Sequence, residues 1–195
     1  MDRIPFPRNR YVIFAMLAVG GFVIDLATKH WVFARLGMPG ATGERIRILG
    51  NVLVLETNLN EGALFGMGQG FQPIFIALAL VAALGILVWL FWSGAAADLW
   101  LTIALGMITA GIFGNFWDRI GMPGLRWPEY TSRAGERIHA VRDWIHFEIE
   151  GWFDFPVFNI ADSLLVIGVG VLLLHTFLVG ENRVATPAAS PAGPN

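Results

Sequence analysis

The stretch FPVFNIADSLLVIGVGVLLL, residues 155–174, decides the fold class of this chain. From Ser163 onward it is an apolar run of the kind that crosses a lipid bilayer, which takes about 20 residues. An amide, Asn159, and a carboxylate, Asp162, lie just before that run. A charge at the mouth of an apolar helix is costly unless it has a partner or a function, so Asp162 is the first candidate site residue.

The composition of the whole chain is that of an integral membrane protein. Of its 195 residues, 55% are hydrophobic and 14% are charged, and the formal net charge is −2. This balance does not indicate a nucleic-acid partner. The absence of cysteine excludes disulfides, thiolate catalysis and Cys-ligated metal centres. We expect no metal ion or cofactor.

Four segments are long and apolar enough to span the membrane. The first is interpreted as a retained span, because its apolar run is too long for a cleaved signal peptide. With an even number of spans, both chain ends lie on the side of the short 93–98 turn, and the two long connections lie on the other side. The predicted spans are residues 11–33, 71–92, 99–117 and 158–179.

The two long connections differ in pattern. Residues 34–70 contain RIRILGNVLVLE, whose partial alternation of apolar and polar residues predicts one or two short strands. Residues 118–157 mix aromatic, proline and charged residues, which predicts an irregular or partly helical interfacial segment. The fold class is therefore a mainly α membrane protein with one domain over residues 1–180. The tail 181–195 is rich in Pro, Ala and Ser and is predicted to be disordered and cytoplasmic.

Polar residues from three predicted spans and a loop gather at one membrane face, whereas His175 lies near the other. Asp25 and Lys29 are four residues apart in the first span, a spacing typical of an ion pair, and Asp118 is expected to hold Arg119. Groups that converge in this way usually line a site. The converging residues are Asp25, Lys29, Asn115, Asp118, Arg119, Asp143, Asn159 and Asp162.

Two carboxylates are the best candidates for chemistry. A zinc site at His139 and His146 lacks an identifiable third ligand, and no serine-hydrolase or phosphate-loop motif is present. If Asp143 and Asp162 are held together, one keeps its proton near neutral pH, so the pair can activate water and polarise a carbonyl. By residue type alone, Asp25, Asp118 and Asp154 remain alternatives for either role.

Four patterns resemble those of the bacterial lipoprotein signal peptidases (signal peptidase II), and the resemblance covers about residues 11–180. The resemblance implies an intramembrane aspartyl endopeptidase of the cell inner membrane, a hydrolase that removes the signal peptide from diacylglyceryl-modified prolipoproteins. Asp143 and Asp162 match the family's catalytic aspartates, which leaves Asp118 a supporting role. The patterns are DLATK at 25–29, NEGALFG at 60–66, GNFWDR at 114–119, and VRDWI at 141–145 followed by FPVFNIADS at 155–163.

The resemblance also implies the surroundings of the site. The family has an extracytoplasmic β-cradle, here at about residues 44–70, and both termini in the cytoplasm. Its members act on prolipoproteins within membrane lipid and are inhibited by globomycin-type cyclic peptides, and we expect a monomer. Residues that match its substrate-binding or supporting positions are Asp25, Lys29, Asn60, Gly62, Ala63, Phe65, Asn115, Arg119, Asn159 and Ala161.

Two features depart from the family pattern. The segment between Asp118 and Asp143 is longer than the family leads us to expect, so residues 120–140 are interpreted as an inserted, mobile and peripheral loop. If this insertion shifts the alignment, Asp154 replaces Asp143, although Val141, Trp144 and Ile145 favour Asp143. The arginine distribution between the two faces favours the reverse orientation, with the site inside.

Two other functions remain open. One is a small proton- or ion-coupled transporter that uses Asp25, Lys29 and Asp162. The other is a non-catalytic membrane scaffold. No half-helix break or inverted repeat is visible, and the charges gather at a face instead of the midplane, which favours the peptidase.

Overall fold

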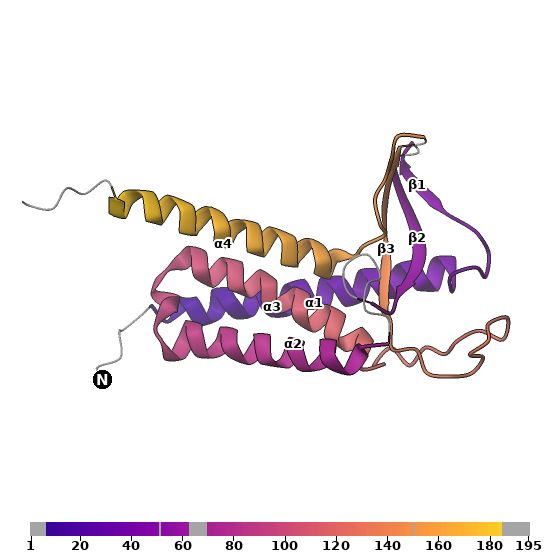
Figure 1. Ribbon diagram of the computed structural model, residues 1–195, viewed down its shortest axis with the longest axis horizontal. Helices are drawn as coiled ribbons and strands as arrows, with labels where there is room; N and C mark the ends of the chain where they lie inside the picture. The colour runs from indigo at the N-terminus through magenta and orange to yellow at the C-terminus, as the bar shows by residue number, and fades with distance from the viewer. Residues whose placement is uncertain (1–6, 51, 63–69, 150, 185–195) are drawn as a thin grey trace, which may run out of the picture.

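Four long helices lie side by side in the computed structural model, which describes residues 7–50, 52–62, 70–149 and 151–184 (Figure 1). Each is long and apolar enough to cross a membrane, as the sequence predicts. Helix α1 begins and α4 ends at the end of the bundle where a short turn joins α2 to α3 (Figure 1). The helices are α1 (Asn9–Leu36), α2 (Gln72–Leu87, continued by a π-helical turn, Val88–Trp92), α3 (Leu99–Arg119) and α4 (Ile160–Val184).

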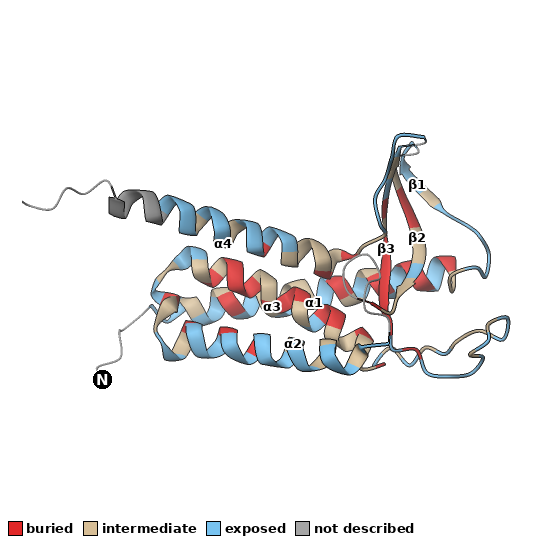
Figure 2. Cartoon of the chain, in the orientation of Figure 1, coloured by how far each residue is buried: buried red, intermediate tan, exposed pale blue. Residues whose placement is uncertain are grey.

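Helix α3 is the centre of the bundle, because α1, α2 and α4 all pack against it. Small residues on α3 permit this close packing. A β-carbon added at Gly114 would lie 2.5 Å from Asp25 Oδ2 on α1 and 2.9 Å from Ala161 Cβ on α4, and one at Gly111 would collide with the Ala161 carbonyl. The outer faces of the helices expose apolar side chains, among them Val166 at 71% (Figure 2), as expected where the solvent is lipid.

An antiparallel sheet lies across the other end of the bundle (Figure 1). It has four strands in the order β1-β2-β3-β4. Its first two strands confirm the prediction of short strands between residues 34 and 70. The sheet packs against the bundle through a buried apolar cluster. In this cluster Val32, Phe33 and Leu36 of α1 contact Leu55 and Trp144 of the sheet. The strands are β1 (Ile46–Leu49), β2 (Leu53–Asn60), β3 (Val141–Ile149) and β4 (Phe153–Asp154).

Strand β3 corrects the expectation of an irregular or partly helical segment over residues 118–157. Residues 141–149 pair with β2, so that Asp143 lies opposite Asn58 and His146 lies opposite Val54. A strand is stabilised by cross-strand partners that are distant in sequence, and the partner of β3 lies more than 80 residues earlier. Local composition therefore could not predict it.

The last helix extends past the predicted start of the C-terminal tail. Helix α4 continues to Val184, so residues 181–184 are helical and not part of a disordered tail. Residues 185–195 lie outside the described residues. The sequence ENRV at 181–184 carries two charges, but charged residues are good helix formers once an apolar helix has been nucleated before them.

Residues 120–140 form a defined hairpin between α3 and β3. Trp127 N donates to Glu136 O and Ile138 N donates to Leu125 O, both at 2.9 Å. Gly121, Gly124 and Gly135 adopt positive φ angles, which suits the turns that the sequence predicts here. The mobility of this segment stays a prediction.

Candidate active site

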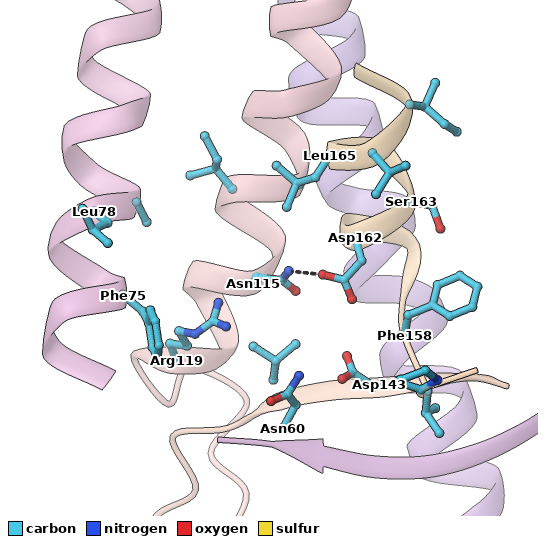
Figure 3. A pocket seen from close by; sticks show the side chains of 18 of the residues that line it. Asn60, Phe75, Leu78, Asn115, Arg119, Asp143, Phe158, Asp162, Ser163 and Leu165 are labelled. Atoms are coloured by element: carbon cyan, nitrogen blue, oxygen red, sulfur yellow. Dashed lines mark hydrogen bonds between the residues drawn. The ribbon is translucent and has the colours of Figure 1, made fainter. Parts of the chain in front are cut away.

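Strand β3 and the segment before α4 bring Asp143 and Asp162 to the same place (Figure 3). Trp144 N and Ile145 N donate to Phe158 O at 2.9 and 2.8 Å, and Phe158 N donates back to Ile145 O at 3.0 Å. Asp143 lies two residues before this bridge on one side, and Asp162 lies one helical turn after it on the other. The two carboxylates face each other because the chain is tied at residues 145 and 158.

A capping box fixes Asp162 at the start of α4. Asn159 precedes the first helical residue, and its Oδ1 accepts a hydrogen bond from Asp162 N at 2.9 Å. In return, Asp162 Oδ2 accepts from Asn159 N at 3.2 Å. This reciprocal pair satisfies backbone donors at the helix N-terminus. It also holds the Asp162 carboxylate at the positive end of the helix dipole, which suits an anion.

The side chain of Asp143 is more deeply buried than that of Asp162. Its side chain is buried, and Oδ1 accepts from Asn159 Nδ2 at 2.6 Å. Its Oδ2 is buried and has no hydrogen-bond partner among the described residues. Burial raises the pKa of Asp143 to about 8, the negative charge of Asp162 adds to this rise, and the amides of Asn159 and Asn60 oppose it. Near neutral pH the Asp143 carboxyl therefore keeps its proton.

Asn115 links the two carboxylates to the helices. Its Nδ2 donates to Asp162 Oδ1 at 2.7 Å (Figure 3). Its Oδ1 accepts from Lys29 Nζ at 3.1 Å and from Asn159 Nδ2 at 3.2 Å. Because one end of this amide accepts from a cation, the other end is oriented to donate to Asp162.

A buried ion network lies directly behind the site. Lys29 Nζ is 2.7 Å from Asp25 Oδ2 and 3.1 Å from Asp118 Oδ2, and all three side chains are fully buried. Asp25 Oδ1 accepts from Ala161 N at 2.9 Å, next to Asp162. Asp118 accepts from the backbone N, Nε and Nη2 of Arg142, at 3.1, 3.0 and 2.8 Å, next to Asp143. Each supporting acid thus anchors the residue before one candidate catalytic acid.

This network corrects the expectation that Asp118 holds Arg119. Adjacent helical residues point about 100° apart, so Asp118 turns toward Lys29 and Arg142. Arg119 instead donates to Gly62 O at 3.0 Å and covers the Phe75 ring, 5.3 Å from its centroid. Arg142 is a supporting residue that the sequence did not reveal; its signal was an arginine within an otherwise apolar stretch before Asp143.

The turn after β2 closes another side of the site. Gly62 N donates to Asn60 Oδ1 at 3.0 Å, and Asn60 lines the cavity with Arg119 and Asp143. The predicted site residues Ala63 and Phe65 lie outside the described residues.

An apolar cavity of about 720 Å³ leads away from the two aspartates between α2 and α4. The carboxylates lie at its polar end, and Arg119 and Asn60 lie beside them (Figure 3). This shape suits an apolar segment with a polar group at one end. Apolar lining residues include Phe75, Leu78, Ile112, Phe158, Leu165 and Val166.

The sequence model of the family described as "Signal peptidase (SPase) II" matches residues 17–178 of the chain. The chain belongs to the signal peptidase II family. It is 43% identical to the lipoprotein signal peptidase of Rhodopirellula baltica, over 88% of this chain and 74% of that one. It is 36% identical to the lipoprotein signal peptidase of Shouchella clausii, over 82% and 89% of the two chains.

Solved structures agree with this assignment. A bacterial membrane enzyme determined by the in meso method at 2.3 Å resolution superposes with a TM-score of 0.70 at 25% identity, over 97% of this chain and 99% of that one. A second, determined at 1.9 Å, gives 0.65 at 27% identity, over 90% and 96%. The protein is thus a multi-pass membrane peptidase of the signal peptidase II family, which acts on prolipoproteins.

The geometry of this signal peptidase II also separates the alternative residues. Asp154 lies on β4 with its side chain 83% exposed, 2.8 Å from His146 Nε2. His139 Nδ1 contacts Arg119 O at 2.9 Å, so the two histidines have separate partners. Asp25 and Asp118 are engaged by Lys29. Of the candidate acids, only Asp143 and Asp162 among the described residues line the cavity.

Proposed function

We propose that this signal peptidase II cleaves diacylglyceryl-modified prolipoproteins by an aspartyl mechanism in which Asp143 and Asp162 are the catalytic residues. One observation carries the proposal: two carboxylates from β3 and α4 face each other at the polar end of an apolar cavity (Figure 3). Neither forms an ion pair with a Lys or Arg in the part of the chain that the structure describes. Such a pair can exchange one proton between them.

The environments of the two aspartates support a different proposed role for each. Asp162 receives two N–H donors and the helix dipole, so it acts as the anion that accepts a proton from water. The water oxygen attacks the scissile carbonyl carbon, and the protonated Asp143 donates its proton to the carbonyl oxygen. In the second step the roles reverse: Asp162 gives its proton to the leaving nitrogen, the C–N bond breaks, and Asp143 regains a proton from the hydroxyl.

The shape of the cavity supports a placement for the proposed substrate. The apolar signal helix fits between α2 and α4, against the α3 residues that line the cavity. The scissile bond then lies beside Asp143 and Asp162, with Asn60 and Arg119 in reach of its backbone. The acyl chains extend into the surrounding lipid.

The proposed orientation places the sheet and the active site outside the cytoplasm and both termini inside. The substrate's cleavage site is near that outer interface, and the arginines that argued for the reverse include Arg119 and Arg142, which the site itself uses. A reporter fused after Ser93 should behave as cytoplasmic, and one inserted at Ser132 as extracytoplasmic. The opposite pattern contradicts this orientation.

The transporter alternative is not favoured by the geometry. Asp25 and Lys29 would have to face a wet pathway, but both are fully buried, 2.7 Å apart, and absent from the cavity lining. A carboxylate and an ammonium that neutralise each other in a dry interior have no site for a passing ion.

The deciding experiment uses the purified full chain and a synthetic diacylglyceryl prolipoprotein peptide. We expect cleavage at the bond before the modified cysteine, read by product mass, and inhibition by a globomycin-type cyclic peptide. An unlipidated peptide of the same sequence is the control. A folded preparation that does not cleave the lipidated peptide contradicts the proposal, and proton uptake in liposomes would then test the transporter.

A further inference from the structure

The hairpin of residues 120–140 fixes the side chain of one arginine, Arg133. Arg133 Nε donates to Glu136 Oε2 at 3.1 Å, and its guanidinium lies 4.8 Å from the centroid of the Trp127 ring. Trp127 is itself fixed across the hairpin by backbone hydrogen bonds with Gly135 and Glu136, each at 2.9 Å. A guanidinium held by a ring and a carboxylate loses little further freedom when it binds a third group.

The hairpin as a whole is attached to the end of α1 and to α3. Tyr130 OH donates to Pro39 O, just after α1, at 2.8 Å, and His139 Nδ1 contacts Arg119 O, at the end of α3, at 2.9 Å. Ile138 is buried, and Leu125 packs on the apolar cluster that joins α1 to the sheet. The tip of the hairpin therefore has a defined place relative to the sheet.

From that place Arg133 reaches the turn beside the active site. Its Nη1 donates to Glu61 Oε1 at 2.6 Å. Glu61 lies between Asn60, which lines the cavity, and Gly62, whose carbonyl accepts from Arg119 at 3.0 Å. Asn60 is also the last residue of β2 and pairs there with Val141, two residues before Asp143. The turn is thus held by α3 from one side, by β3 from a second and by the hairpin from a third.

We propose that the 120–140 hairpin is a brace for the Asn60–Gly62 turn, and that Arg133 is a positioning residue for cleavage. Through Glu61, the brace keeps the Asn60 amide beside Asp143 and presents a fixed backbone edge to the substrate. The inference rests on the proposed function, since it assigns this turn to the same site. The Arg133 and Glu61 side chains are 41% and 25% exposed, so a several-fold effect is expected and not the loss of turnover.

The test compares two arginines of the same hairpin. Arg133→Gln removes the charge that reaches Glu61, whereas Arg126→Gln removes a charge that donates within the hairpin, to Gly135 O at 2.7 Å. We expect Arg133→Gln to raise KM for the lipidated peptide by about threefold to fivefold with kcat little changed, and Arg126→Gln to leave both near wild type. Arg133→Glu should be worse than Arg133→Gln, and Glu61→Arg added to Arg133→Glu should recover part of the loss.

A second readout does not depend on activity. Hydrogen–deuterium exchange of the Gly62 amide, which is bonded to Asn60, should become faster in Arg133→Gln but not in Arg126→Gln. If the wild type does not cleave the peptide, the proposed function fails and the exchange alone decides the brace. If it does cleave, then an Arg133→Gln variant with wild-type KM, or with wild-type exchange at Gly62, overturns the brace.

Discussion

Two pairs of carboxylates lie at the same end of this bundle in opposite surroundings. Asp25 and Asp118 share Lys29, and Asp118 also binds Arg142. Asp143 and Asp162 accept hydrogen bonds from amide groups, and neither has an ion pair within the described ranges. The first pair is neutralised by cations, and the second can be stable only if it holds a proton.

Under the proposed mechanism, the first pair supports the site and the second carries out the chemistry. The neutralised pair gives its remaining bonds to Ala161 N and to Arg142, so it positions the residues beside Asp162 and Asp143. Removing a member of the first pair should therefore act mainly on stability. Removing a member of the second should act mainly on turnover.

The largest expected effect is on turnover in Asp143→Asn and Asp162→Asn. Each change keeps the side-chain size but removes a proton site, so cleavage should fall by about 10³-fold or more, because the two residues act as a unit. Substrate binding should persist through the apolar cavity. Turnover is measured by cleavage of the lipidated peptide, and substrate binding is measured by photocrosslinking. Asp154→Asn, on the exposed β4, is the matched control and should retain activity; the reverse result would move the dyad to Asp154.

The next effect is on stability in Lys29→Met. This change leaves Asp25 and Asp118 buried without their shared cation, which should cost about 3–5 kcal/mol of unfolding free energy. Asp143→Asn, by contrast, should melt at or above the wild-type temperature. Thermal unfolding in one detergent compares the two. Equal melting of Lys29→Met and the wild type would remove the distinction between the two pairs.

A smaller effect is expected in Asp118→Asn. Asparagine keeps one acceptor for Arg142 but loses the charge, so we expect a less stable protein with measurable cleavage. The arginine that loses its partner is Arg142 and not Arg119. The double variant with Asp118→Asn and Arg142→Gln should therefore lose less stability than the sum of the losses of the two single variants. Additive losses in melting would mean that the two side chains do not interact.

The pH dependence should follow the second pair. The pKa of Asp143 is raised to about 8 in the folded protein from an ordinary value near 3.8. Cleavage should therefore decline as pH rises through about 8, by about tenfold per pH unit once the proton is lost. The folded state holds this proton more tightly than the unfolded state, so its stabilising contribution is lost as pH rises toward 8. Asp143→Asn should thus gain melting temperature relative to the wild type between pH 5 and pH 9.

The smallest effect is expected from deleting residues 124–136. Of the contacts described above, only that between Arg133 and Glu61 joins the deleted residues to the site, because His139, which contacts Arg119 O, is retained. Cleavage should therefore persist at a level reduced by several-fold. The deletion should reproduce Arg133→Gln in KM. Complete loss of activity in a folded deletion variant would mean that the hairpin builds the site instead of bracing it.

The sequence by itself determined the four spans, since each is an apolar run of the length that a bilayer requires. Its motifs also named Asp143 and Asp162, Asn115, Asn159 and Arg119, because the resemblance carried those positions directly. These are properties of single segments, so local composition or a short motif is enough to predict them.

Only the tertiary structure decided which residues meet. Strand β3 exists because β2 pairs with it, Asp118 binds Arg142 because adjacent helical side chains diverge, and Arg133 reaches Glu61 from 72 residues away. Gly111 and Gly114 matter because two other helices cross α3 there. Each of these depends on contacts between segments distant in sequence, and the free energy of such contacts is set by packing geometry that no single segment contains.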